Sequence, residues 1–386
     1  MCHFLSGWIK IDGSEVYPGD LVHHEKGARI HGIDESVACP WEWLPGQAQP
    51  SVVLSPEAID TGATERWYAH LLVEKFGTRS GAIQWCLQHL HPNVLRLDLI
   101  KWEEITHLPA LPHIEQVEFN DCAEIKELPA LPNVRWLCLK KCPGIKKLPE
   151  LPNVQDIRLV GCTGIRELPA LPNVKHLYLN GNAGIKELPA LPNIERLQII
   201  GGNEITHLSE LPTIRLLYLN GCVNIPKLPA LPSIKTLDLT RCANISKLPA
   251  LSGVDWLNLT CCAGIGELPA LPNVKELYLV GCAGIRELPA LPNIKILDLA
   301  GCANIPKLPE LPNIEELYLA GCTGIKKLPE LSHVKYLDLT GCVNIKELPE
   351  LPNIEYLYLK GCTGIKELPA LPNIKELESD QNWILA

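Results

Sequence analysis

The stretch NVKELYLVGCAGIRELPALP, from Asn273 to Pro292, decides the fold because the chain repeats it. Copies of this twenty-residue unit follow one another in register, without insertion or deletion, from Asn93 to Pro372, which is 280 residues or fourteen copies. A fixed period of this length is typical of solenoids, in which each repeat stacks on the next. The sequence therefore predicts a solenoid for most of the chain.

Nearly every copy places apolar residues at the same seven positions. Around Leu277, Tyr278 and Leu279 they alternate with polar residues, as in a short strand with one buried face, and Gly281 supplies a turn. The LPALP segment favours extended or polyproline backbone and excludes a helix, because proline fixes its own φ angle and restricts the residue before it. In the quoted copy the seven positions are Val274, Leu277, Leu279, Cys282, Ile285, Leu288 and Leu291.

A single rung of strand, turn and extended return buries too little apolar surface to offset the entropy of ordering it. Neighbouring rungs must therefore stack, with their strands paired in a parallel ladder. The two ends of such an array need caps.

The pattern V-x-x-L-x-L-x-G-C-x-x-I resembles the leucine-rich repeat. The LPxLP segments are similar to the short twenty-residue repeats of bacterial effector proteins, and the G-C-x-x-I run to cysteine-containing repeats of bacterial and plant proteins. The resemblance covers about three quarters of the chain. It implies a β-rich solenoid with a parallel sheet on the concave face, an extended convex side and a role in protein binding.

The chain divides into three parts by this reading. Residues 1–92 lack the period and predict a small α+β head: short strands and turns to about residue 54, then helices over about 56–90 that cap the first rung. Residues 93–372 are the fourteen repeats. Residues 373–386 form a partial repeat and a tail.

Charge and hydropathy narrow the range of partners. The net charge is −9, and no basic run is present, which argues against nucleic acid or an anionic membrane as partner. No apolar stretch approaches the length of a membrane span, and the opening MCHFLSGWIKIDG is unlike a cleaved signal peptide. We expect a cytoplasmic protein, with export into a host cell without a cleaved signal as the alternative.

Cysteine recurs at one phase of the repeat. A ladder of equivalent side chains does not converge as tetrahedral zinc ligands do, and the same position holds Asn182 in one copy. We therefore predict buried structural thiols that donate hydrogen bonds to turn carbonyls, with no metal and no cofactor. Eleven of the sixteen cysteines belong to this ladder: Cys122, Cys142, Cys162, Cys222, Cys242, Cys262, Cys282, Cys302, Cys322, Cys342 and Cys362.

Strand alternation sends the residues at the phases of Glu276, Tyr278 and Val280 to the concave surface. Towards the C-terminus this surface is aromatic and acidic, which suits Lys or Arg side chains; before residue 221 basic and acidic residues nearly balance. The alternative is that Tyr and Asp only form the solvated face of the sheet, where tyrosine favours strands and cross-strand pairs stabilise them. The candidate partner-binding residues are Tyr178, Tyr218, Asp238, Trp256, Glu276, Tyr278, Asp298, Glu316, Tyr318, Tyr336, Asp338, Tyr356 and Tyr358.

We therefore expect a non-enzymatic scaffold that binds a protein or a basic extended peptide on the concave face. A bacterial effector that acts by binding in a host cell is one alternative. An enzyme in the head is the other, and the sequence offers for it only His23, His24, His31 and Cys39. No sequence pattern of a catalytic or phosphate-binding site is present.

Overall fold

The computed structural model describes residues 9–11, 14–16, 51–54, 95–100, 105–182, 184–202 and 204–381. The chain forms two compact units, Met1–Ala190 and Leu191–Ala386, called here the N-terminal unit and the C-terminal unit. The helices predicted over about 56–90 and the four candidate head residues lie outside the described residues. The predicted boundary at residue 92 stays a prediction.

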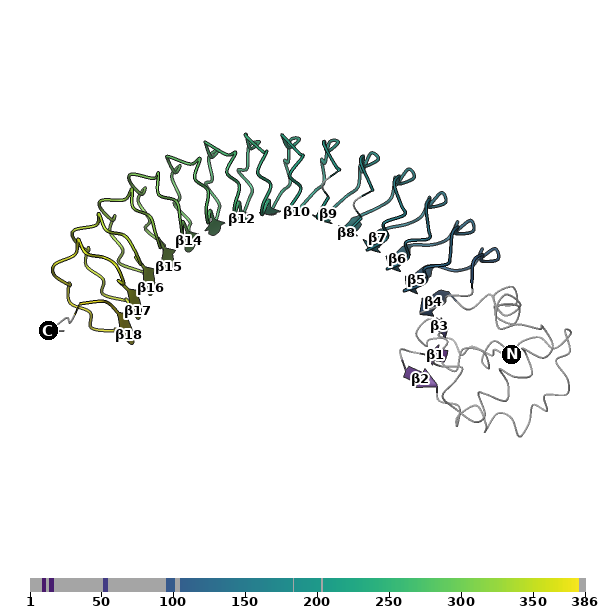
Figure 1. The fold of residues 1–386 in the computed structure, drawn as a ribbon, viewed down its shortest axis with the longest axis horizontal. Coiled ribbons are helices and arrows are strands. Elements are labelled where there is room, and N and C mark those ends of the chain that lie inside the picture. Colours follow the sequence, from purple (N-terminus) through teal and green to yellow (C-terminus); the bar gives the residue numbers. More distant parts are fainter. Residues whose placement is uncertain are drawn as a thin grey trace, which may run out of the picture. The chain divides into compact units, whose positions relative to one another are not determined.

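In the N-terminal unit, parallel strands stack at intervals of twenty residues (Figure 1). Three short strands precede them: β1 is antiparallel to β2 and β3, and β3 is parallel to β4. The strands are β1 (Ile9–Ile11), β2 (Ser14–Val16), β3 (Ser51–Leu54), β4 (Arg96–Ile100), β5 (Gln116–Asn120), β6 (Trp136–Lys140), β7 (Asp156–Val160) and β8 (His176–Asn180).

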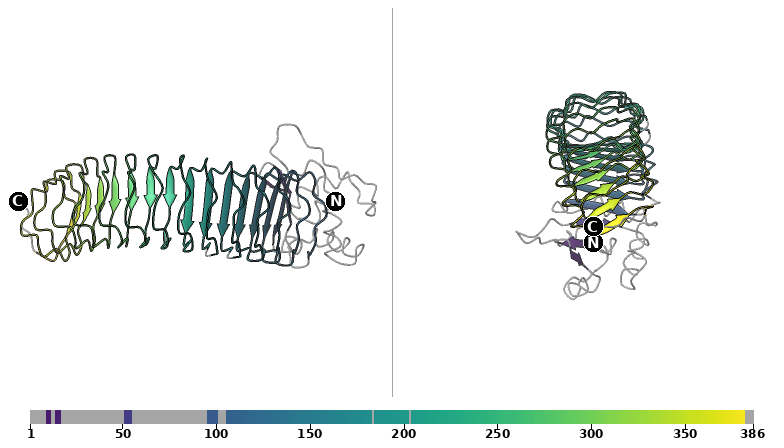
Figure 2. Two further views of the ribbon diagram at one scale, coloured as in Figure 1. Left: turned by 90° about the horizontal axis from the view of Figure 1, so that it is seen from above. Right: turned by 90° about the vertical axis from the view of Figure 1, so that its left-hand side faces the viewer.

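The C-terminal unit continues the same rung, and its strands all run in one direction (Figure 2). The strands are β9 (Arg196–Ile200), β10 (Leu216–Asn220), β11 (Thr236–Asp238), β12 (Trp256–Asn258), β13 (Glu276–Tyr278), β14 (Ile296–Asp298), β15 (Glu316–Tyr318), β16 (Tyr336–Asp338), β17 (Tyr356–Tyr358) and β18 (Glu376–Glu378).

Three turns bend the rung around β13 in the C-terminal unit. The N–H of Cys282 donates to the carbonyl of Leu279 at 2.9 Å, and the N–H of Ile285 donates to Cys282 at 3.3 Å. A third turn closes from Ile294 to Leu291 across a Pro-Asn pair, with proline at the position where its fixed φ angle favours a turn. The LPALP segment between turns is extended, as predicted.

The two glycines of the quoted copy have different structural causes. Gly281 has a φ angle of 69°, the left-handed region that a turn of this kind demands at its third residue. Gly284 has an ordinary φ angle, but a Cβ atom there would lie 2.6 Å from the carbonyl oxygen of Ile265 in the preceding rung. The first glycine therefore sets the turn, and the second permits close stacking.

The core lies where the seven apolar positions predicted it. In the quoted copy all seven side chains are buried, and Leu288 is the most exposed at 7%. The leucine-proline return contributes least, since leucine at the Leu288 phase is only half-buried in several other rungs. The predicted β-solenoid with a parallel sheet is confirmed for the described residues.

The cysteine ladder is also confirmed as a structural feature. Cys282 Sγ donates to the carbonyl of Leu259, 2.8 Å away, and Cys302 repeats this contact with Leu279 at 3.0 Å. Asn182 Nδ2 makes the equivalent bond to Leu159 at 2.7 Å. In these rungs the phase holds a small buried donor, whereas one rung has Gly202 there. The described ladder cysteines are free thiols.

Candidate partner-binding face

In the three-residue strands β13, β15 and β17, the first and third residues point away from the core, because the middle residue between them is buried. In both units the strands lie on the inner side of the bend (Figure 1). The surface made by the phases of Glu276, Tyr278 and Val280 is called the inner face of each unit below. This is the surface that solenoids of this kind use for binding.

On the inner face of the N-terminal unit, charged side chains neutralise one another. Arg96 contacts Asp98 at 2.9 Å and Glu118 at 3.1 Å, and Lys140 Nζ lies 2.7 Å from the second oxygen of Glu118. The hydrogen bond to Glu118 raises the pKa of Lys140. Glu118 therefore joins cations from β4 and β6, and the ladder of strands brings all of them together.

A second set of contacts continues this pattern around Arg158. Its Nε lies 3.1 Å from Asp156, which also contacts His176 Nδ1 at 3.3 Å. The Arg158 guanidinium lies over the ring of Tyr178, 4.9 Å from its centroid. Tyr178, a predicted binding residue, is thus covered by a cation of its own unit.

On the inner face of the C-terminal unit, carboxylates contact hydroxyl groups instead of cations. The Tyr278 hydroxyl donates to Glu276 at 2.9 Å, and the Tyr318 hydroxyl donates to Glu316 at 2.8 Å. Burial, together with the hydrogen bond to Glu276, raises the pKa of Tyr278 to about 12. In the part of this unit that the structure describes, the ion pairs of Lys side chains involve Asp255, Glu315 and Glu355, and neither of these two glutamates.

Aromatic rings gather next to these Glu-Tyr pairs. The ring centroids of Tyr318 and Tyr336 are 4.7 Å apart, and those of Tyr336 and Tyr358 are 5.3 Å apart. Tyr356 joins the group at 6.1 Å from Tyr336. The rings come from β15, β16 and β17, so the four tyrosines form one cluster across three strands, called the tyrosine cluster below.

The other predicted aromatic residues lie on β10 and β12. Trp256 packs on Tyr278, with ring centroids 5.6 Å apart. Tyr218 lies under the guanidinium of Arg196, 5.3 Å from its ring centroid. The structure therefore brings Trp256 to the Glu-Tyr pairs, whereas Tyr218 has a cation of its own.

The predicted aspartates also have a local structural role. One oxygen of Asp298 accepts the N–H of Ala300 at 3.0 Å, and one oxygen of Asp338 accepts that of Thr340 at 2.8 Å. Asp238 is 9% exposed and uses both oxygens, one with Thr240 and the other with Asn220 at 3.2 Å. Asp238 therefore has less to offer a partner than Asp298 or Asp338.

A search of solved structures found similarity to YopM from Yersinia enterocolitica WA-314. The two chains are 26% identical with a TM-score of 0.60, and the match covers 75% of this chain and 65% of that one. This chain is a leucine-rich repeat protein of the bacterial type. It spans less than two thirds of the length of that YopM chain.

Other solved leucine-rich repeat proteins match with lower scores. A leucine-rich effector protein from Yersinia pestis, also YopM, is 22% identical with a TM-score of 0.40, over 76% of this chain and 84% of that one. A leucine-rich repeat protein from Bacteroides ovatus is 14% identical with a TM-score of 0.32, over 62% and 76%. No family model matches the chain, and no curated protein matches it.

Three thiols of the C-terminal unit of this leucine-rich repeat protein are poor nucleophiles. Burial raises the pKa of Cys282 to about 12, and the pKa values of Cys322 and Cys342 are raised to the same level. Among the described residues, no three His, Cys, Asp or Glu side chains gather as a metal site would require. Nor does the described part contain a helix with the length and apolarity of a membrane span.

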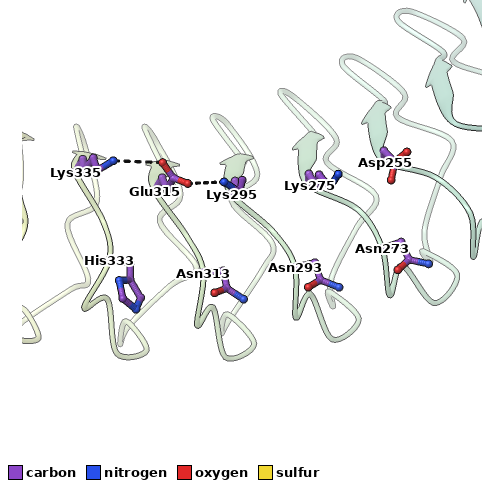
Figure 3. Close-up of a pocket in the computed structure, with 9 residues that line it drawn as sticks. All are labelled: Asp255, Asn273, Lys275, Asn293, Lys295, Asn313, Glu315, His333 and Lys335. Carbon is purple, nitrogen blue, oxygen red and sulfur yellow. Dashed lines mark hydrogen bonds and ion pairs between the residues drawn. The ribbon is translucent and has the colours of Figure 1, made fainter.

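A groove of about 700 Å³ beside the strands of the C-terminal unit was not predicted (Figure 3). Its asparagines brace the turns: Asn293 Nδ2 donates to the Pro272 carbonyl at 2.8 Å, and Asn313 to Pro292 at 2.8 Å. Lys295 and Lys335 flank Glu315, at 2.8 and 3.4 Å. In the sequence, this groove is indicated by Asn followed two residues later by a charged residue. In the structure, Asn293 and Asn313 already donate to proline carbonyls, and Glu315 is already paired with two lysines.

Proposed function

We propose that the chain is a non-enzymatic scaffold that binds a protein through the inner face of its C-terminal unit. The partner segment on that face is basic and extended. The observation that carries the proposal is a contrast between the two inner faces. In the C-terminal unit, Glu276 and Glu316 lie beside half-buried tyrosines and have no ion pair among the described residues. In the N-terminal unit, the inner-face carboxylates of Asp98, Glu118 and Asp156 are paired with cations.

The chemistry of this face favours cations. Glu276 and Glu316 each use one hydroxyl contact, which leaves acceptor capacity on the carboxylate for a Lys or Arg side chain. The tyrosine cluster adds large, rigid rings, which are enriched among the residues that dominate binding energy. Lys and Arg also bind over aromatic rings.

The charges of two aspartates on the same face also favour a basic partner. Burial raises the pKa of Asp298, and the negative charge of Asp338 raises it further. The carboxylates of Asp298 and Asp338 therefore lie close enough to repel each other, and a bound cation would stabilise their negative charge. A basic partner therefore gains both ion pairs and relief of repulsion.

Partner capture tests this proposal. The full chain and a Tyr278→Ala, Tyr318→Ala, Tyr358→Ala variant are used as bait in the native cell extract, with crosslinking and mass spectrometry. A Lys275→Ala, Lys295→Ala, Lys335→Ala variant alters the neighbouring groove and serves as control. The expected result is that only the tyrosine variant loses specific partners; identical partner profiles for all three baits would reject the proposal.

Effector action inside a host cell is a second candidate for the setting of this binding, favoured by the structural similarity to YopM of Yersinia enterocolitica. The first candidate setting is the cytoplasm of the producing cell, where the chain would act as a scaffold. A secretion assay on the intact protein, combined with the reading of neighbouring genes for export machinery, separates the two. Retention in the producing cell under secretion-inducing conditions would remove the effector candidate.

A further inference from the structure

The two Glu-Tyr pairs of the C-terminal unit are spaced by two rungs. Glu276 in β13 and Glu316 in β15 occupy the same strand position, and the parallel register places Ile296 of β14 between them. Neighbouring strands in a parallel sheet lie about 4.8 Å apart. The inner face therefore presents two equivalent carboxylates about 10 Å apart, twice that strand spacing.

Only some backbone conformations place two side chains at this separation on the same side. A polyproline II segment rises about 3.1 Å per residue with three residues per turn, so side chains three apart point alike and are about 9 Å apart. In a β-strand, residues three apart face opposite sides, and residues two apart are only about 7 Å apart. In a helix, residues seven apart are separated by about 10.5 Å.

The bend of the unit favours the shorter spacing. The strands lie on the inner side of the bend, so side chains that project from them converge (Figure 1). Their tips are then closer together than the strands that carry them. Polyproline II fits this separation better than a helix does.

The tyrosine cluster supports the same conformation. It begins at Tyr318, whose hydroxyl contacts Glu316, and continues through Tyr336 to Tyr358 on the next two strands. Grooves lined by aromatic rings are a recurring way of binding proline-rich polyproline II segments, because the ligand is already extended and loses little entropy. The acidic and aromatic parts are thus consecutive along one unit.

We infer that the C-terminal unit binds a polyproline II segment with two Lys or Arg side chains three residues apart, one at Glu276 and one at Glu316, and with prolines on the tyrosine cluster. This inference rests on the proposed function, since it names the partner segment for the same face. It adds a rule of spacing that general attraction between opposite charges does not supply.

Synthetic peptides test the spacing rule directly. Three fluorescent peptides of identical composition, each with two arginines in a proline-rich backbone, carry the arginines two, three or four residues apart. Binding to the full chain is followed by fluorescence anisotropy. The peptide with a spacing of three is expected to bind at least tenfold more tightly, as when one hydrogen bond to a charged group is gained.

Two variants connect the preference with the named side chains. Glu276→Gln with Glu316→Gln should abolish the preference between spacings, whereas Glu315→Gln, which removes the same charge from the neighbouring groove, should retain it. Equal affinity for all three peptides, loss of the preference in Glu315→Gln, or absence of binding to any of them would overturn the inference. A helical peptide with arginines seven residues apart that bound more tightly would also overturn it. Partner capture still decides the proposed function in each of these cases.

Discussion

The two units use one rung but leave their inner faces in opposite electrostatic states. In the N-terminal unit Glu118 lies between Arg96 and Lys140, and each contact is an ion pair. In the C-terminal unit Glu276 and Glu316 occupy comparable strands, and their contacts are tyrosine hydroxyls. The buried positions make the scaffold in both, and the exposed strand positions decide whether a face satisfies itself or is available to a partner.

The largest expected effect concerns partner binding. Replacing Tyr278, Tyr318 and Tyr358 with alanine should weaken binding of the captured partner at least 100-fold, because aromatic residues at the centre of an interface often contribute about 2 kcal/mol or more each. Tyr178→Ala, in the N-terminal unit, should leave the affinity within about twofold. Titration calorimetry measures both, and equal losses would remove the distinction between the units.

A smaller effect is expected in the ladder of buried donors. Asn182 accepts the N–H of Cys162 at 2.9 Å and donates to Leu159, so Asn182→Ala leaves two buried groups without their partner and should cost about 2 to 3 kcal/mol. Cys282→Ala loses one thiol contact, since the Cys282 N–H is held by Leu279, and should cost about 1 kcal/mol. Urea unfolding compares them; a larger cost for Cys282→Ala would contradict this account of the ladder.

Neutralising an inner-face glutamate should destabilise the N-terminal unit more than the C-terminal unit. Glu118→Gln removes the partner of two cations and should lower the free energy of unfolding by about 1 kcal/mol, a value limited by the solvent exposure of Arg96 and Lys140. Glu316→Gln removes an unpaired charge and should change it by less than about 0.5 kcal/mol. Hydrogen exchange at low ionic strength resolves the two units, and equal destabilisation would show that Glu316 is paired after all.

The smallest effect concerns alkaline pH. The folded-state pKa of Tyr278 is about 12, above its ordinary value of about 10, so folding favours the protonated phenol. Its contribution to stability is complete below about pH 10 and is lost as the pH rises through about 12. Glu276→Gln should lower this pKa in a tyrosinate absorbance titration, with Glu315→Gln as the control that leaves it unchanged. An unaltered titration in Glu276→Gln would mean that the Glu-Tyr pair is not formed.

Much of the scaffold could be predicted from the sequence because its cause is periodic. The seven apolar positions and the Asn182 exception determine the core and the thiol ladder, since a stacked repeat buries equivalent positions alike. Arg241 and Cys261 stand at the turn position that Gly281 occupies in the quoted copy. Both keep a left-handed φ angle of 60° without glycine, because neighbouring rungs impose the turn. A single local residue could not have indicated this.

The candidate face could be predicted only in part. Its residues follow from strand alternation, but their contacts depend on side-chain choice in adjacent rungs. Asp298 was expected to serve a partner and also accepts the N–H of Ala300, a local bond that the same residue type makes in many turns. The pairing of Glu118 with cations from two other strands likewise requires the stacked geometry.

Oxidative footprinting of the full chain, with and without its captured partner, tests the central claim most directly. The account predicts protection of Tyr278, Tyr318, Tyr336 and Tyr358 on binding, with Trp136 and Tyr178 unchanged. Protection of Trp136 and Tyr178 while the tyrosine cluster stays fully reactive would contradict it.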